Sequence, residues 1–160
     1  MSTVTLRPMT DAEFAAFRSA ATRAYADELA ATSGWPAEEA LERAQQDSAE
    51  LLPHGRDTPG MQVSTAVLDD GTPIGWLWLG LTHPGGVPDC GFVYDIEIAE
   101  AHRGGGLGRA LLAAGEDVLR SHGLRAVELN VFEGNTRAIG LYSSTGYRVV
   151  RQQMRKDLTA

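Results

Sequence analysis

The residues best suited to chemistry form a short stretch in which two arginines flank four glycines, Arg103-Gly-Gly-Gly-Leu-Gly-Arg109. Three consecutive glycines cost backbone entropy, so they are expected where a chain turns sharply or approaches a ligand closely. The stretch lies between a predicted strand and a predicted helix, whose first N–H groups and dipole would form an anion site. The spacing alone leaves open a glycine-rich turn without a ligand.

The two common nucleotide-binding loops do not match this stretch. A dinucleotide fingerprint, G-x-G-x-x-G, starting at Gly104 would require a glycine where Arg109 stands. The P-loop pattern G-x-x-x-x-G-K-[ST] does not occur there either. What remains is R-x-x-G-x-G between a strand and an amphipathic helix, which indicates an anionic ligand of another kind.

At these residues the sequence resembles the GCN5-related N-acetyltransferase (GNAT) superfamily, because the segment from Ile96 to Leu112 is similar to that family's acetyl-CoA motif. The resemblance implies that the loop amides hold the pyrophosphate of acetyl-CoA. It also implies that the backbone at Ile96 and Ile98 pairs with the pantetheine arm. The implied pyrophosphate residues are Arg103, Gly104, Gly105, Gly106, Leu107 and Gly108.

A second stretch, from Asn135 to Tyr147, resembles the later motif of the same family, N-x-x-A-x-x-L-Y-x-x-x-G-[FY]. The resemblance implies that Asn135 bonds the cofactor arm and that Tyr142 lies near the thioester sulfur. The two motifs follow each other in the family's order and separation. We therefore expect an acetyl-CoA-dependent acyltransferase, an N-acetyltransferase acting on groups other than aminoacyl groups.

Amine acetylation requires a base, since a lysine-type amine with a pKa of about 10.4 is protonated at neutral pH. Asp95 and Glu97 lie on the strand before the loop and share one face by the period-2 rule, so each is a candidate base, with a water relay as the alternative. Tyr142 is the candidate acid for the leaving thiolate. The same rule predicts that Tyr94 shares the opposite, core-facing side with Ile96 and Ile98.

The acceptor site leaves a weaker signal. Tyr25 and Trp35 lie in the first helical region and in the break after it, a part of the chain that often covers the acceptor in the resembled family. Trp76 and Trp78 share one strand face, where they form the core, a cleft wall or, less directly, a cage for a cation.

Metal and covalent chemistry find little support. The four histidines show no ligand spacing, so we expect no metal site, and Cys90 is expected to be a buried or idle thiol. No serine stands in a G-x-S-x-G context.

Periodicity and turn signals predict one domain over residues 1–160. Thr10 and Glu13 form a candidate capping box, and Asp70-Gly71 is a hairpin signal. The predicted strands are residues 4–6, 61–68, 74–81, 92–98, 126–132 and 147–154. The predicted helices are residues 11–31, 38–51, 107–122 and 135–145. The order βααβββαβαβ indicates an α/β (α+β) fold with a mixed, mostly antiparallel central sheet and helices on both faces. The strands on either side of the glycine loop and its helix should lie parallel and splay.

Charge and composition narrow the partners. The net charge of −7 argues against a nucleic-acid-coating protein and weakly favours cationic small substrates. One cysteine, no signal-peptide run and no membrane-length apolar stretch lead us to expect a cytoplasmic protein without membrane contact.

The sequence thus predicts direct acetyl transfer to a primary amine, of a small molecule or of a protein, in a ternary complex. A non-catalytic acyl-CoA-binding or sensing domain and a transferase of a larger acyl group remain alternatives. A homodimer is compatible with the resemblance.

Overall fold

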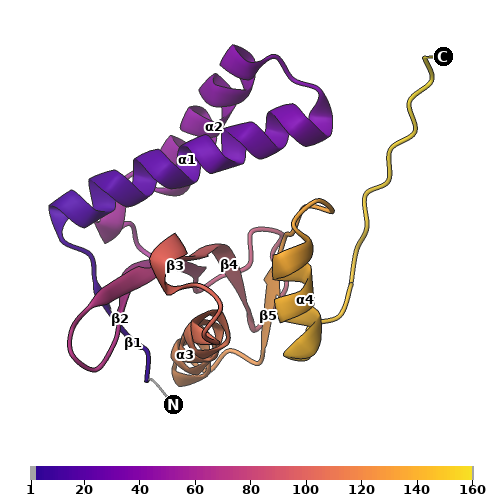
Figure 1. Ribbon diagram of the computed structural model, residues 1–160. Helices are drawn as coiled ribbons and strands as arrows, with labels where there is room; N and C mark the ends of the chain where they lie inside the picture. Colours follow the sequence, from indigo (N-terminus) through magenta and orange to yellow (C-terminus); the bar gives the residue numbers. More distant parts are fainter. Residues whose placement is uncertain (1–2, 160) are drawn as a thin grey trace.

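The structure, a computed structural model, describes residues 3–159 as an alternation of strands and helices (Figure 1). The strands are β1 (Thr5–Pro8), β2 (Met61–Val67), β3 (Pro73–Gly80), β4 (Cys90–Ile98) and β5 (Ala126–Leu129). The helices are α1 (Asp11–Ser33), α2 (Ala37–Leu51), α3 (Leu107–Ser121) and α4 (Thr136–Ser144), with short 3-10 turns η1 (Gly55–Asp57) and η2 (Glu100–His102). No helix within residues 3–159 combines the length and apolar content needed to cross a bilayer.

The central sheet confirms the predicted mixed architecture. Its order is β1-β2-β3-β4-β5, and every neighbouring pair is antiparallel except β4 and β5, which run parallel. The β4–β5 pairing ends at Val93 with Leu129, while β4 continues to Ile98. The two parallel strands therefore separate before the glycine loop, as predicted.

A bulge in β4 coincides with the point where that separation begins. The register places Asp95 opposite Trp78, and the next pair along the β3–β4 ladder is Val93 with Leu79. Tyr94 is therefore an extra residue in β4, and a bulge of this kind turns two successive side chains to one side of the sheet.

The bulge corrects one prediction. Tyr94 stacks on Trp78 with ring centroids 4.7 Å apart, on the sheet face that carries Phe17 of α1. Ile96 and Ile98 instead pack into the core under α3. The prediction that Tyr94 shares their face is wrong, because the period-2 rule holds only for an uninterrupted ladder.

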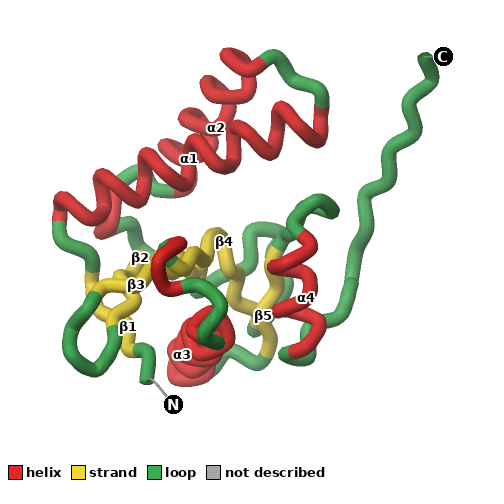
Figure 2. The backbone as a smooth tube through the Cα atoms, viewed as in Figure 1, coloured by secondary structure: helices red, strands yellow, loops and turns green. Residues whose placement is uncertain are grey.

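Helices cover both faces of the sheet, as predicted (Figure 2). On one face α1 inserts Phe17, which is 1% exposed, against Trp78 and Val63. On the other face α3 buries Leu111 and Leu119 against the inner side chains of β3 and β4. The two cores account for the alternation of apolar side chains in the central strands.

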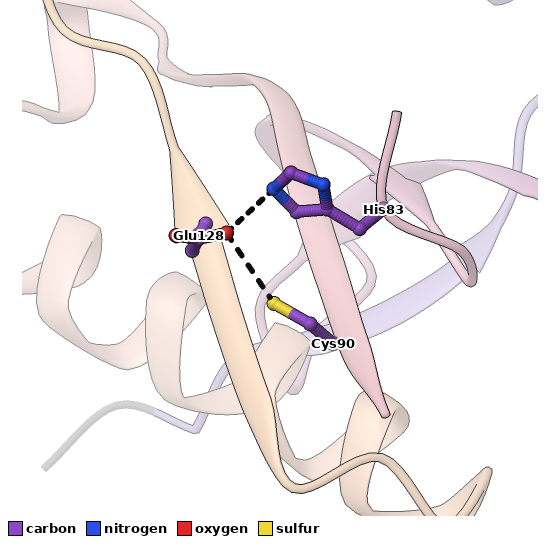
Figure 3. A group of neighbouring side chains, drawn as sticks. All are labelled: His83, Cys90 and Glu128. Atoms are coloured by element: carbon purple, nitrogen blue, oxygen red, sulfur yellow. Dashed lines mark hydrogen bonds and ion pairs between the residues drawn. The ribbon is translucent and has the colours of Figure 1, made fainter. Parts of the chain in front are cut away.

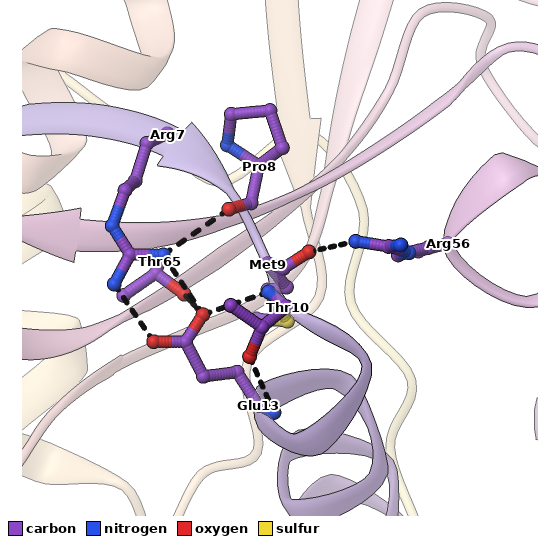
Figure 4. Close-up of polar contacts among 7 residues, drawn as sticks. All are labelled: Arg7, Pro8, Met9, Thr10, Glu13, Arg56 and Thr65. Carbon is purple, nitrogen blue, oxygen red and sulfur yellow. Dashed lines mark hydrogen bonds and ion pairs between the residues drawn. The ribbon is translucent and has the colours of Figure 1, made fainter.

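The start of α1 is fixed by the predicted capping box (Figure 4). The Thr10 hydroxyl accepts from the Glu13 N–H at 3.1 Å, and the Glu13 carboxylate accepts from the Thr10 N–H at 2.8 Å. Arg7 donates to both carboxylate oxygens at 2.8 Å, and Thr65 on β2 donates at 3.0 Å. The Arg7 hydrogen bond, followed by that from Thr10, lowers the pKa of Glu13 to about 2. This network joins β1, β2 and α1.

The prediction of a last strand over residues 147–154 is wrong. The chain beyond α4 is extended but pairs with no strand among the described residues, and Figures 1 and 2 show it leaving the body. Val149 is 70% exposed and Met154 is 90% exposed. The residue types favour a strand, but a strand also requires a neighbouring strand to pair with, and residues 3–159 supply none for this segment.

Candidate active site

The glycine loop begins after η2 and leads directly into α3. Gly104 and Gly106 adopt φ values of +86° and +79°, which non-glycine residues rarely adopt. Gly106 is the N-cap of α3, where no side chain caps the helix and no acidic residue stands in the first turn. The first N–H groups of α3 are therefore left for an acceptor from outside the helix.

Space around the loop separates the roles of its glycines. A Cβ on Gly104, Gly105 or Gly106 would meet no protein atom within 4 Å. Gly105 has no positive φ, so neither its backbone nor a protein neighbour requires glycine there. Gly108 differs, since a Cβ there would contact the Leu141 side chain of α4 at 3.4 Å. The open side of the loop fits a ligand that approaches the backbone closely.

Arg103 ties the loop back to β4. Its Nε donates to the Ile98 carbonyl at 2.8 Å, and its guanidinium forms an ion pair with Glu97. Two residues predicted for different roles, Arg103 for the cofactor and Glu97 as a base, are thus partners of each other. This pairing makes Glu97 the weaker of the two candidate bases, because its carboxylate already accepts from Arg103.

Asp95 is held by the neighbouring strand. The Trp76 indole N–H donates to Asp95 Oδ2 at 2.8 Å. Burial raises the pKa of Asp95; the Trp76 hydrogen bond opposes this rise, and the negative charge of Glu97 adds to it. A carboxyl group whose pKa is raised from its ordinary value is a better proton acceptor when ionised.

Tyr142 lies on α4 and is 9% exposed. Burial raises the pKa of its phenol, and the negative charge of Asp95 raises it further, so the two side chains lie within electrostatic reach. Tyr147 packs beside it with ring centroids 5.5 Å apart and donates its hydroxyl to Glu116 of α3 at 3.1 Å. The candidate acid on α4 is thus near enough to one candidate base on β4 for the charge of Asp95 to act on its pKa.

Asn135 has a local role that the sequence interpretation missed. It is the N-cap of α4, and its side-chain oxygen accepts from the Ala138 N–H at 3.2 Å. The signal was available, since asparagine is a preferred N-cap residue. Its role toward a cofactor stays a prediction.

The four candidate acceptor residues divide into two pairs. Trp76 and Trp78 both lie edge-on to Phe17, at 5.7 and 5.9 Å between ring centroids. Trp78 is 7% exposed and belongs to the core. Tyr25 and Trp35 are exposed side chains of α1 and of the turn after it, a turn that stands away from the sheet (Figure 1). The structure therefore does not bring the four into one cluster.

One polar cluster joins segments that sequence reasoning kept apart. His83 Nε2 lies 2.5 Å from Glu128 Oε2 of β5, and Cys90 Sγ lies 3.8 Å from the same oxygen (Figure 3). The donor types could ligate a metal ion. However, the Gly85 N–H donates to His83 Nδ1 at 2.9 Å, so the neutral ring carries its proton at Nε2, toward Glu128.

An ion at Nε2 would have to displace that proton and disturb the Gly85 hydrogen bond. Burial, followed by the charge of Glu128, also raises the pKa of Cys90, which keeps the thiol protonated. The cluster is accounted for as a hydrogen-bonded link between the β3–β4 loop, β4 and β5. Sequence reasoning could not find it, because Glu128 lies 38 residues from Cys90 along the chain.

Comparison with protein families agrees with this geometry. The model of the Acetyltransferase (GNAT) family matches residues 17–147. Two uncharacterized N-acetyltransferases of Bacillus subtilis, YdgE and YycN, are each 33% identical over 156 residues. The alignments cover 96% of this chain and 98% of YdgE, and 98% of this chain and 99% of YycN.

Solved structures give the same result. The crystal structure of YycN matches with a TM-score of 0.91 at 33% identity and covers 99% of this chain and 100% of that one. Because coverage is nearly complete, the match extends into the exposed residues after α4. The PaiA N-acetyltransferase of Thermoplasma acidophilum, in complex with coenzyme A, matches in fold with a TM-score of 0.67 at 13% identity and covers 94% of this chain and 93% of that one.

Proposed function

Since this chain belongs to the acetyltransferase (GNAT) family and is an acyltransferase, we propose that it transfers the acetyl group of acetyl-CoA directly to a primary amine in a ternary complex. The observation that carries the proposal is Asp95, which follows the point where β4 leaves β5 and accepts from the Trp76 N–H, together with Tyr142 on α4, whose pKa the charge of Asp95 raises. An acid and a base in mutual reach are what amine acylation needs, whereas binding alone does not need them.

The glycine loop supports acetyl-CoA as the co-substrate. Gly105 has no structural reason of its own to be glycine, and α3 begins without a side-chain cap. These features suit a pyrophosphate held by backbone N–H groups of residues 103–108. Acetyl-CoA supplies the activated acetyl group when bound, and the loop and the backbone of β4 at Ile96 and Ile98 orient it.

Asp95 is our candidate base. An acceptor amine enters mostly protonated, and its proton passes to the ionised Asp95 carboxylate directly or through one water. The raised pKa of Asp95 brings its basicity closer to that task. Glu97 is the second candidate, disfavoured by its ion pair with Arg103.

Tyr142 is our candidate acid. Its phenol keeps its proton at neutral pH because burial and the charge of Asp95 both raise its pKa. It can therefore donate that proton to the departing thiolate of coenzyme A. Once Asp95 has accepted a proton from the amine, the charge that opposed ionisation of Tyr142 is removed.

The acceptor class follows from charge rather than from a recognised pocket. The chain carries a net charge of −7, and Asp95 is a half-buried acidic group that accepts from Trp76 on the α1 face of the sheet. Both favour a cationic amine, of a small molecule or of a protein side chain or N-terminus.

The test combines binding with turnover. Calorimetric titration should show binding of acetyl-CoA and of free coenzyme A but not of NAD. An amine panel of polyamines, amino acids, aminoglycosides and lysine peptides is then followed by release of the coenzyme A thiol. A blank that contains the protein alone measures any signal from the thiol of the buried Cys90, and this signal is subtracted.

Two matched variants separate the candidate bases. Asp95→Asn should lose most of the turnover and retain its affinity for acetyl-CoA. Glu97→Gln should keep most of the turnover. Binding without turnover across the panel would favour an acyl-CoA-sensing domain, and faster turnover with longer acyl-CoA would favour transfer of a larger group. Absence of any coenzyme A binding would reject the proposal.

A further inference from the structure

The helices α1 and α2 lie side by side and pack through small side chains (Figure 1). Ala26 of α1 and Ala40 and Ala44 of α2 are all buried in this contact. Nearer the start of α1 and the end of α2, the two helices border a groove with a volume of about 450 Å³. Sites for small molecules have volumes of this order, so the groove is large enough for a ligand.

The polar side chains of this groove are all of a kind that donates hydrogen bonds. They are Arg18, Ser19, Thr22 and Arg23 of α1, with Gln45 and Ser48 of α2. None of the residues that line the groove is acidic. A surface with two permanent cations, three hydroxyl groups and an amide is suited to an anion.

The positive charge of the groove contrasts with the helices that form it. Residues 11–51 hold nine acidic residues and three basic ones. One of the three, Arg43, is paired with Asp47 at 2.9 Å. The other two, Arg18 and Arg23, form no ion pair with any residue of the range 3–159. An acidic pair of helices thus turns its two unpaired cations toward one groove.

Arg18 is held in place and still has donors to spare. Its Nε donates to Ser48 Oγ at 3.2 Å and its Nη2 donates to the Ser48 carbonyl at 3.3 Å. Its guanidinium carbon lies 5.8 Å from the centroid of the Phe14 ring. Because a guanidinium carries five N–H donors, three donors of Arg18 have no acceptor among residues 3–159. An arginine fixed in this way is pre-organised for an oxyanion.

We propose that the groove between α1 and α2 binds a phosphate monoester of a small molecule, with its phosphate between Arg18 and Arg23. Two cations match the charge of roughly −1.5 to −2 that such a phosphate carries at pH 7. Ala15 and Leu41 also line the groove, and they offer the organic part of the ester an apolar surface that a bare phosphate ion would leave unused. None of the lining residues belongs to the candidate active site, so the proposal does not depend on the acetyl transfer proposed above.

The first test locates the ligand by ¹H–¹⁵N NMR of the full-length chain, with glucose 6-phosphate as the probe. We expect saturable shifts at the amides of residues 18–23 and 45–48 and at the Arg18 Nε–H. Shifts confined to residues 103–108 would place the phosphate at the glycine loop and overturn the proposal. So would the absence of a saturable shift up to about 10 mM probe.

Two further probes test the chemistry of the ligand. Inorganic phosphate should bind more weakly than glucose 6-phosphate, because it lacks the organic part. Succinate should bind more weakly as well, because its two charges lie on separate carboxylates. Equal affinity for inorganic phosphate would overturn the assignment of an ester, and equal affinity for succinate would overturn the assignment of a phosphate.

The second test compares three variants that each remove one positive charge. Arg18→Gln and Arg23→Gln should each raise the dissociation constant of glucose 6-phosphate by about tenfold or more. Arg43→Gln on α2 is the matched control and should stay within about twofold of the native value. Arg23 has no hydrogen bond or ion pair within residues 3–159, so Arg23→Gln remains decisive if Arg18→Gln loosens the two helices. Equal weakening in all three variants would mean that net charge alone attracts the probe, and the proposal would be wrong.

Discussion

The β4–α3 segment and the α1–α2 region differ in which atoms form their functional surface. In the β4–α3 segment, the important groups are backbone N–H groups, fixed by positive φ at Gly104 and Gly106. In the α1–α2 region, the exposed candidates are the side chains of Tyr25 and Trp35. Their residue type alone does not identify them as an acceptor site.

This difference explains why the candidate cofactor loop can be recognised from the sequence and the acceptor site cannot. A site made of backbone leaves its trace as glycines at fixed spacing, because only glycine tolerates the required φ values. A site made of side chains depends on which elements the fold brings together. The first kind predicts a ligand class, and the second predicts little until the acceptor is known.

The largest expected effect comes from Gly106→Glu. The new carboxylate would stand at the uncapped start of α3, where φ of +79° also disfavours a side chain. We expect acetyl-CoA affinity to fall by at least about 100-fold, equal to roughly 2.7 kcal/mol, because repulsion adds to strain. Calorimetry measures the change.

Gly71→Glu is the control for strain. Gly71 has φ of +85° and equally open surroundings but lies in the turn between β2 and β3. It should lose stability as Gly106→Glu does and keep its acetyl-CoA affinity. If both variants bound acetyl-CoA equally, the glycine loop would be a turn without a ligand.

Tyr142→Phe should have the next largest effect. Removal of the phenolic proton donor should lower kcat by about 100-fold and leave the acetyl-CoA dissociation constant within about twofold. Ser143→Ala, the next and exposed residue of α4, is the control. An unchanged kcat would make Tyr142 a packing residue beside Tyr147.

The sequence predicted those features that depend on local pattern. The capping box at Thr10 and the glycine loop follow from neighbouring residues. The parallel pairing of β4 and β5 follows from the order of the elements on either side of that loop. The bulge at Tyr94 does not, because nothing in the alternation of β4 shows where the ladder slips. The link from His83 to Glu128 and the unpaired segment after α4 depend on contacts, or on missing contacts, between distant parts of the chain.

Trp76→Phe tests whether the two regions are linked through Trp76, which packs against Phe17 of α1 and donates a hydrogen bond to Asp95 of β4. The Trp76 N–H lowers the pKa of Asp95, so its removal should raise that pKa. A base works above its pKa, and the acidic limb of the kcat/KM profile should therefore move to higher pH. The rate below that limb should fall several-fold.

Trp78→Phe is the matched control, because the buried Trp78 N–H has no hydrogen-bond partner among the described residues. Its profile should keep the native limb. A shift of equal size in both variants would mean that the limb reports packing around Phe17 rather than the Asp95 carboxyl.

The smallest effect is expected from Glu13→Gln, which acts on the anchoring of α1 and leaves the glycine loop untouched. The variant weakens the Arg7 contacts and the cap, so we expect a loss of about 1 kcal/mol in unfolding free energy at pH 7. The pKa of Glu13 is lowered to about 2 from 4.5, so the stability that Glu13 contributes is present above about pH 4.5 and is lost as pH falls through about 2.

Urea denaturation at pH 7 and pH 3 should show a smaller loss of unfolding free energy in Glu13→Gln at pH 3 than at pH 7. Asp27→Asn on the same helix should show no loss at either pH. A difference that stays constant would mean that Glu13 acts through packing rather than charge. A changed acetyl-CoA affinity would mean that the two regions are not independent.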